Sequence, residues 1–275
     1  MTRMGTLYVV ATPIGNLEDI TLRARRILGE VALIAAEDTR RTRQLLNHLE
    51  LTTPALSYFE HNKLSRIDQI LAALESGDVA LVSDAGTPAV SDPGQELVRA
   101  ALDAGHAVVP VPGASAVLAA LVASGLPTDS FYFLGFLGRR SSDRREALGA
   151  VAQIQATLIL YESPHRLADL LEDALAVLGD RQAAVAREVT KLHETFVRGS
   201  LSHCLAHFKG AEVLGEVTVL IDGARPVEQR RWEETEVRAE LARQLATGLR
   251  RREAAKAVAD LSAWAPKDIY DLDLT

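Results

Sequence analysis

The sequence predicts an α/β fold made of two α/β halves and a short helical extension. From the start of the chain to Val111, short apolar runs alternate with segments of helical periodicity. Such alternation indicates a mainly parallel sheet covered by helices on both faces. After Gly223 a polar segment containing Pro226 precedes further helical periodicity. We therefore expect α/β domains over residues 1–112 and 113–223, and a linker with a helical extension over 224–275.

The first half is expected to contain five strands, each followed by a helix or a loop. Helical spacing is clearest where Leu45, Leu46 and Leu49 share one face and arginines lie on the other. The expected strands are Thr6–Ala11, Val31–Ala36, Leu56–Phe59, Val79–Val82 and Ala107–Val111, and the expected helices are Leu22–Leu28, Thr39–Leu49, one around Ile67–Leu74 and Gln95–Gly105.

The second half begins with an apolar helix for which Ser115 is a suitable N-cap. Glu194–Gly199 is expected to be a hairpin strand or an antiparallel edge, and Gly138–Arg145 a polar, basic loop. The remaining expected strands are Phe131–Phe136, Thr157–Tyr161, Ala183–Ala186 and Gly215–Gly223, with helices at Ala116–Gly125, Glu146–Ile154 and Leu167–Leu178.

The extension has helical spacing at Val237, Leu241 and Leu245 and again over Arg252–Leu261. It is too short to be expected to bury much core of its own. We therefore expect it to pack on the body of the protein or on a partner.

Composition limits the class of protein. The chain is 48% hydrophobic, and no apolar run approaches the length of a membrane span or a signal peptide. The single cysteine, Cys204, excludes an intrachain disulfide and a cysteine zinc site, so we expect a buried thiol in a reduced, cytoplasmic protein. A net charge of −7 argues against coating nucleic acid by bulk electrostatics, although local arginine clusters leave a phosphate-rich partner open.

Several turn-rich or charged loops follow predicted strands. The most elaborate is Ser83–Gly94, which is rich in Gly, Pro, Ser and Asp. In open α/β sheets, ligands bind at the carboxyl ends of strands, so this loop predicts a small-molecule site. The other loops of this kind are Thr12–Thr21, Glu37–Arg43, Glu162–Arg166 and Arg187–Lys191.

These loops lack the standard nucleotide and metal motifs. The chain has neither a G-x-G-x-x-G fingerprint nor a Walker A sequence at its first loop, which disfavours nicotinamide dehydrogenases and P-loop enzymes. No dense histidine or cysteine spacing supports a metal site. Plain structural roles remain open, because Asp38 is equally suited to cap a helix and His165 to be a surface side chain.

Six motifs occur together and in order, namely Thr12–Thr21, Ala36–Arg40, Ser83–Gly94, Val111–Ser115, Tyr161–Arg166 and Arg187–Lys191. On these motifs the chain resembles the ribosomal RNA small-subunit methyltransferase I family. That family lies within the tetrapyrrole methylase superfamily of class III S-adenosylmethionine-dependent methyltransferases. The resemblance runs from about Leu7 to Gly223. The segment Gly248–Ala255 is similar to the family's helix-turn-helix-like extension.

The resemblance implies a bilobal protein that binds S-adenosylmethionine between its lobes, largely through backbone groups. Corrin and siroheme methylases of the superfamily have a G-x-G-P-G-D first loop, whereas this chain has Thr12–Leu17, which favours RNA as the substrate. Glu188 is expected near the adenosine. The implied cofactor contacts are Pro13, Asp84, Ala85, Gly86, Thr87, Val90, Ser115, Ala116 and Glu162.

The implied reaction is 2′-O-methylation of a cytidine ribose in the decoding region of 16S rRNA, on the small ribosomal subunit, by a homodimer without a metal. The candidate proton acceptors are Lys191, Glu188, His165 and Asp38; alternatively they bind ribose or phosphate and the proton leaves to water. The expected RNA contacts are Arg40, Arg41, Arg43, Arg139, Arg140, His165 and Arg166, with arginines of the extension.

Two other functions stay open at this point. The first is another methylase on the same fold, acting on a tetrapyrrole precursor or, like diphthine synthase, on a protein. The second is a non-enzymatic RNA- or ribosome-binding module that retains the cleft. Binding of the cofactor separates the enzymes from the module.

Overall fold

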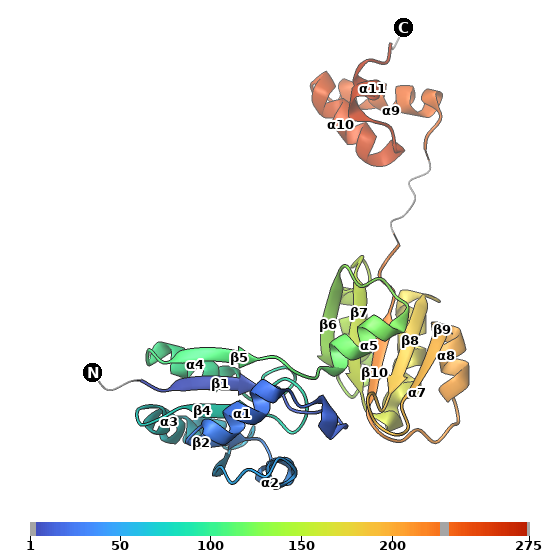
Figure 1. The fold of residues 1–275 in the computed structure, drawn as a ribbon. Helices are drawn as coiled ribbons and strands as arrows, with labels where there is room; N and C mark the ends of the chain where they lie inside the picture. Colours follow the sequence, from blue (N-terminus) through green and yellow to red (C-terminus); the bar gives the residue numbers. More distant parts are fainter. Residues whose placement is uncertain (1–3, 226–230, 274–275) are drawn as a thin grey trace. The chain divides into compact units, whose positions relative to one another are not determined.

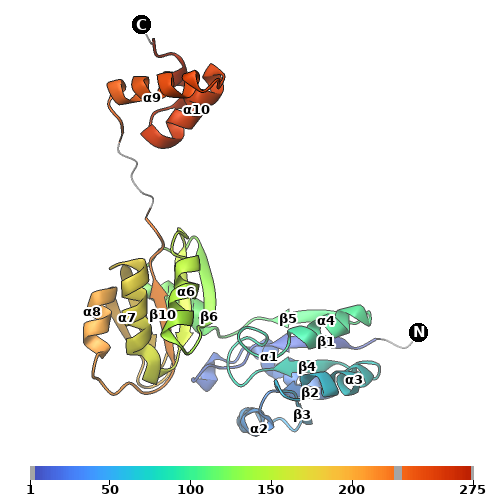
Figure 2. The same cartoon turned by 180° about the vertical axis from the view of Figure 1, so that it is seen from behind.

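The computed structural model describes residues 4–225 and 231–273 and divides into two compact units, Met1–Ala224 and Arg225–Thr275. Each unit is described by itself (Figures 1 and 2). The first unit contains both sheets, one built from strands within residues 6–111 and the other from strands within 131–221. The domain boundary expected near residue 112 stays a prediction.

The first sheet is parallel throughout, as the sequence predicts. Its strands are β1 (Thr6–Val10), β2 (Leu33–Ala36), β3 (Ala55–Ser57), β4 (Val79–Val82) and β5 (Ala107–Val111), in the order β3-β2-β4-β1-β5. Its helices are α1 (Leu22–Glu30), α2 (Thr39–His48), α3 (Lys63–Leu74) and α4 (Gln95–Asp103), with a short 3-10 helix η1 (Leu17–Asp19) after β1.

Both faces of this sheet are covered. On one face, Val10 and Val82 pack with Ile27 of α1 and Leu46 of α2. On the other face, Leu7 and Leu81 pack with side chains of α3 and α4. Because both faces are buried, the central strand β4 is buried along its whole length, which explains why its sequence is continuously apolar.

The second sheet is mixed. Its strands are β6 (Phe131–Phe136), β7 (Thr157–Glu162), β8 (Gln182–Arg187), β9 (Thr195–Ser200) and β10 (Val217–Ile221), in the order β6-β7-β10-β8-β9. Only β6 and β7 pair in parallel; the other neighbours are antiparallel, and β9 is the antiparallel edge that the sequence predicts.

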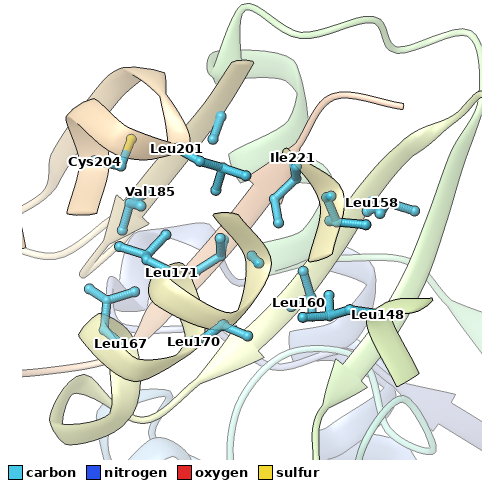
Figure 3. Close-up of a cluster of buried hydrophobic side chains, with 14 of the residues drawn as sticks. Leu148, Leu158, Leu160, Leu167, Leu170, Leu171, Val185, Leu201, Cys204 and Ile221 are labelled. Carbon is cyan, nitrogen blue, oxygen red and sulfur yellow. The ribbon is translucent and has the colours of Figure 1, made fainter. Parts of the chain in front are cut away.

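Helices also cover the second sheet. Helix α5 (Ala116–Ser124) packs on one face, and α6 (Ser141–Ala150), α7 (Leu167–Leu178) and α8 (Leu201–Phe208) pack on the other. Figure 3 shows this second core, in which Leu171 of α7 lies among side chains that include Val185. Cys204 of α8 is fully buried there, as expected.

The start of α6 corrects one expectation. The sequence predicts a loop over Gly138–Arg145, but the helix begins at Ser141. The Ser141 hydroxyl and the Arg144 guanidinium both donate hydrogen bonds to Asp173 of α7. These contacts stabilise a helical first turn that local polarity alone does not predict.

The extension has its own core, which is a second correction. Its helices are α9 (Glu234–Ala246), α10 (Arg251–Ser262) and α11 (Pro266–Tyr270), and the sequence predicts only the first two. Val237, Leu241, Val258 and Ile269 are fully buried among them. Part of the predicted linker, residues 226–230, lies outside the described residues. Across both described ranges, no helix is long and apolar enough to cross a membrane.

Candidate active site at the strand-end loops

The loops that follow β1 and β4 are joined through their backbones. The amide of Thr12 donates to the carbonyl of Gly86 at 2.9 Å, and the amide of Gly86 donates to the carbonyl of Thr12 at 3.0 Å. Gly86 has a φ of +78°, which favours glycine, and an added Cβ would lie 3.3 Å from Ile14 Cγ2. This pair, the Thr12–Gly86 bridge, brings the two predicted cofactor loops together.

The loop after β2 joins the same site through carboxylates. Glu37 Oε2 accepts a hydrogen bond from the amide of Asp84 at 3.2 Å, and Asp84 Oδ1 accepts one from the amide of Asp38 at 3.0 Å. The guanidinium of Arg41 lies 3.5 Å from Asp84 Oδ2. The sequence therefore places these three loops correctly at one edge of the sheet.

Asp92, in the loop after β4, belongs to the predicted loop but not to the predicted contacts. Burial and the nearby charge of Glu37 raise its pKa to about 6, although a hydrogen bond with Ser83 opposes the shift. Burial also raises the pKa of Glu37. The signal in the sequence is that acidic residues follow neighbouring parallel strands, whose ends meet at one edge.

Lys191 connects the loop after β8 with the loop after β1. Its Nζ donates to Glu188 Oε1 at 2.8 Å and to Glu216 Oε2 at 3.1 Å. Its aliphatic stem lies against Gly15, where an added Cβ would come within 2.3 Å of Lys191 Cγ. Next to Lys191, the hydroxyl of Thr190 donates a hydrogen bond to Asp19 Oδ2 of η1 at 2.7 Å.

The ion pairs of this loop set the charge of Lys191. Partial burial alone would lower the pKa of Lys191, but the hydrogen bonds with Glu188 and Glu216 outweigh burial and raise it. The bond from Lys191 also lowers the pKa of Glu188. Lys191 is therefore an ammonium and Glu188 a carboxylate at neutral pH.

The two other predicted proton acceptors form no hydrogen bond with Lys191 or Glu188 among the described residues. Asp38 is the N-cap of α2, and its bonds with Arg40 lower its pKa to about 2. The helix-capping interpretation of Asp38 is confirmed. His165 is exposed in the 3-10 helix η2 (Pro164–Arg166), which follows β7.

Glu162, at the end of β7, is buried and has an unsatisfied oxygen. Its Oε1 accepts from the amide of Ser163 at 2.6 Å and from Arg166 Nε at 2.7 Å. Its Oε2 is buried without a hydrogen-bond partner among the described residues. A buried carboxylate oxygen without a hydrogen bond lowers the stability of the fold. Glu162 Oε2 is therefore a suitable acceptor for a hydrogen-bond donor of a bound ligand.

Two cavities lie beside the loop after β1, and Ile14 lines both. The larger, of about 900 Å³, contains Ser115, and the smaller, of about 370 Å³, contains Pro13, Asp84 and Ala85. Both volumes suit a small-molecule ligand. The larger is also lined by Asp19, Thr21, Arg23, Pro112, Gly113, Ala114, Ala119, Ala123, Val189, Thr190, Glu194 and Phe196, and the smaller by Thr12, Gly15, Leu17, Arg41, Thr42, Gln44, Leu45, Ser83, Lys191 and Glu216.

The remaining predicted cofactor contacts line neither of these cavities. Thr87 and Val90 are exposed in the loop after β4. Ala116 begins α5, directly after Ser115, whose hydroxyl caps that helix as predicted. The helix start is thus a fixed element beside the larger cavity.

The predicted RNA-binding arginines fall into two groups. Arg40, Arg41 and Arg166 form ion pairs with neighbouring carboxylates. The second group has exposed side chains without hydrogen bonds or ion pairs to other described residues, and consists of Arg43, Arg139 and Arg140. Among the described residues, no group of three or more histidine, cysteine or acidic side chains could bind a metal ion.

Comparison with known proteins adds three findings. The family model for tetrapyrrole (corrin/porphyrin) methylases matches residues 6–204. The chain is 48% identical over 272 residues to "Ribosomal RNA small subunit methyltransferase I" of Halalkalibacterium halodurans, covering 98% of this chain and 94% of the relative. It is also 48% identical over 273 residues to the protein of the same name from Synechocystis, covering 98% of each.

Among solved structures, the fold is similar to that of uroporphyrin-III C-methyl transferase from Thermus thermophilus complexed with S-adenyl homocysteine. The TM-score is 0.55 at 23% identity, over 78% of this chain and 96% of that one. At this identity the similarity concerns the fold.

Proposed function

Because this chain belongs to the tetrapyrrole (corrin/porphyrin) methylase family, and within it to the ribosomal RNA small subunit methyltransferase I family, we propose that it methylates the ribose 2′-hydroxyl of a cytidine in the decoding region of 16S rRNA. It is a methyltransferase, and its cofactor is S-adenosylmethionine. The observation that carries the proposal is the Thr12–Gly86 bridge, which joins two predicted cofactor loops beside the Lys191 ion pairs.

The cofactor supplies a methyl group that its sulfonium makes electrophilic. The residues proposed to bind it are those of the bridged loops, chiefly Pro13 and Asp84–Thr87, with Val90, Ser115–Ala116 and Glu162. The unsatisfied Oε2 of Glu162 offers an acceptor for a hydroxyl or amine of the ligand. The carboxylates around Asp84 give this edge a negative potential, which suits a cationic ligand.

We propose that Asp92, whose carboxyl group has a hydrogen bond with Ser83 in the lining of the smaller cavity, accepts the proton of the 2′-hydroxyl. A general base works best when its pKa lies near the working pH, and the pKa of Asp92 is raised to about 6. The pKa of Asp38 is too low, and Lys191 is protonated. Lys191 then serves as a fixed positive charge that orients the oxygen or a phosphate of the RNA, and His165 contacts RNA at the surface.

The substrate is proposed to be the assembled small subunit. With a net charge of −7, the chain attracts RNA only through local patches, which Arg43, Arg139 and Arg140 provide. Local patches favour a folded substrate over a short hairpin. We further propose a cytoplasmic homodimer, supported by the exposed apolar side chains Leu118 and Val122 of α5, and sedimentation velocity checks its mass.

Mapping of ribose methylation tests the proposal. Small-subunit RNA from a deletion strain is expected to lack one 2′-O-methyl mark at a decoding-region cytidine by mass spectrometry, and wild-type protein should restore it on isolated subunits. An unchanged map would contradict the proposed substrate. Methyl transfer to a uroporphyrinogen instead of subunits would support the tetrapyrrole alternative.

A further inference from the structure

An aromatic cluster lies at the carboxyl ends of β6 and β7. The rings of Phe133 and Tyr161 meet edge-on with centroids 5.0 Å apart, and those of Phe136 and Tyr161 are tilted with centroids 5.5 Å apart. Phe136 is nevertheless 58% exposed. The Phe136 ring is therefore held in place by packing on Tyr161, while much of its surface faces solvent.

The cluster adjoins the proposed cofactor loops. Gly135, next to Phe136, has a φ of +65°, and an added Cβ would lie 3.2 Å from Ser91 Oγ in the loop after β4. Burial and the nearby charge of Asp92 raise the pKa of Tyr161 to about 12, and the Tyr161 hydroxyl has a hydrogen bond with the backbone of Val117 at the start of α5. Tyr161, on which Phe136 packs, thus lies near both Asp92 and the first turn of α5.

Unpaired positive charge follows directly after β6. The four arginines between β6 and the middle of α6 divide into two pairs. Arg144 and Arg145 both bind Asp173, so each of these guanidinium groups already has an anionic partner within the fold. Arg139 and Arg140 are exposed, without an ion pair to other described residues. The Arg139 carbonyl accepts a hydrogen bond from Arg144 Nη1 at 2.8 Å, which fixes the backbone that presents them.

We propose that Phe136 is a stacking platform for an unpaired base of the substrate RNA, while Arg139 and Arg140 contact the adjoining phosphates. This inference rests on the proposed function and names how the substrate nucleotide is presented. Proteins recognise unpaired RNA by stacking bases on exposed aromatic rings beside positive charge. A ribose hydroxyl can reach a cavity between loops only if its nucleotide leaves the neighbouring stack, and a platform beside Asp92 stabilises that state.

Three variants of the full chain test the platform. Phe136→Ala removes the ring, Phe136→Tyr keeps it, and Tyr132→Ala is the matched control, because Tyr132 is a 46% exposed aromatic side chain of the same strand outside the cluster. Each is assayed for KM and kcat on small subunits from the deletion strain, and for S-adenosylmethionine affinity by calorimetry. Phe136→Ala should raise KM by roughly 5- to 150-fold, the range for loss of one stacked base.

The controls decide between the platform and other roles. Phe136→Tyr and Tyr132→Ala should stay within about twofold of wild type in KM, and all variants should bind S-adenosylmethionine alike. An Arg139→Ala/Arg140→Ala double variant should raise KM. It should also make KM less dependent on salt concentration, by an amount that corresponds to the loss of up to two phosphate contacts. A near-normal KM for Phe136→Ala, or an equal rise for Tyr132→Ala, overturns the platform.

Two further outcomes are separable. Sedimentation velocity shows whether Phe136→Ala turns a dimer into a monomer, which would assign Phe136 to an interface between two copies and refute RNA stacking. If the wild-type protein methylates subunits while Phe136→Ala does so equally well, only the platform fails. If the wild-type protein does not methylate subunits at all, the proposed function fails with it.

Discussion

The Asp173 network allows a quantitative test of how the basic segment after β6 is held. Asp173 lies on α7 with its side chain only 4% exposed, and it accepts hydrogen bonds from Ser141 Oγ at 2.7 Å, Arg144 Nε at 2.8 Å and Arg145 Nε at 2.6 Å. The Arg144 side chain is equally buried. Replacing Asp173 by Ala therefore leaves a guanidinium buried without a counter-charge.

The expected loss follows from that burial. Removing one partner of a buried ion pair costs about 3–5 kcal/mol of the free energy of unfolding. The half-exposed Arg145 adds little, because exposed ion pairs contribute under about 1 kcal/mol. In a unit of this size, each kcal/mol of lost unfolding free energy lowers Tm by about 2–4 °C. The expected fall in Tm is therefore about 6–20 °C.

Urea and thermal unfolding, followed by circular dichroism at pH 7, measure the loss. Glu172→Ala is the matched control, because Glu172 precedes Asp173 on α7 but is exposed and lies 3.5 Å from Lys209; it should cost under about 1 kcal/mol. An Asp173→Leu/Arg144→Met double variant should recover most of the stability, since no buried charge remains. If Asp173→Ala unfolds like Glu172→Ala, the reasoning is refuted.

The pH dependence gives an independent check of the same network. Burial alone would raise the pKa of Asp173, but the hydrogen bonds from Arg145, Ser141 and Arg144 outweigh it and lower that pKa. A lowered carboxyl pKa adds stability that is present above the unfolded value, about 4, and is lost as pH falls through the folded one. Wild-type stability should therefore decrease below pH 4 more steeply than that of Asp173→Ala.

Three further results are expected. Lys191→Ala should lower kcat by about 100-fold because a fixed positive charge is lost, whereas Lys209→Ala, at an exposed position, should leave kcat unchanged. If the two variants have the same kcat, the Lys191 ammonium has no role in the reaction. Gly86→Ala should lower stability by about 1–3 kcal/mol and weaken S-adenosylmethionine binding in calorimetry, because its φ is +78°, whereas Gly149→Ala in α6, with open space around it, should do neither. Because the Asp92 carboxylate is the proposed base and its pKa is about 6, wild-type kcat should rise as the pH passes 6 and then level off, and Asp92→Asn should lack this rise. The raised pKa also means that ionisation of Asp92 lowers the free energy of unfolding as the pH increases from about 4 to 6. The Asp92→Asn variant should not show this decrease.

Local sequence determined most of the strands and helices, except the start of α6 and helix α11, and also the edge where the site lies. Runs such as Val79–Val82 are apolar because both faces of a parallel strand are covered, and this pattern needs no knowledge of the partners. The capping roles of Ser115 and Asp38 are equally local, since each side chain bonds an amide two or three residues ahead. The meeting of the loops after β1, β2 and β4 follows from parallel strand order.

Only the tertiary structure decided which charges are free and which are paired. Nothing local distinguishes Arg139 from Arg144, yet one is exposed and the other is bound to Asp173, a residue 29 positions away. The raised pKa of Asp92, the contact of Lys191 with Gly15 and the packing of Phe136 on Tyr161 likewise depend on segments distant in the chain. Electrostatic energy and burial depend on distances in space, which residue spacing along the sequence does not contain.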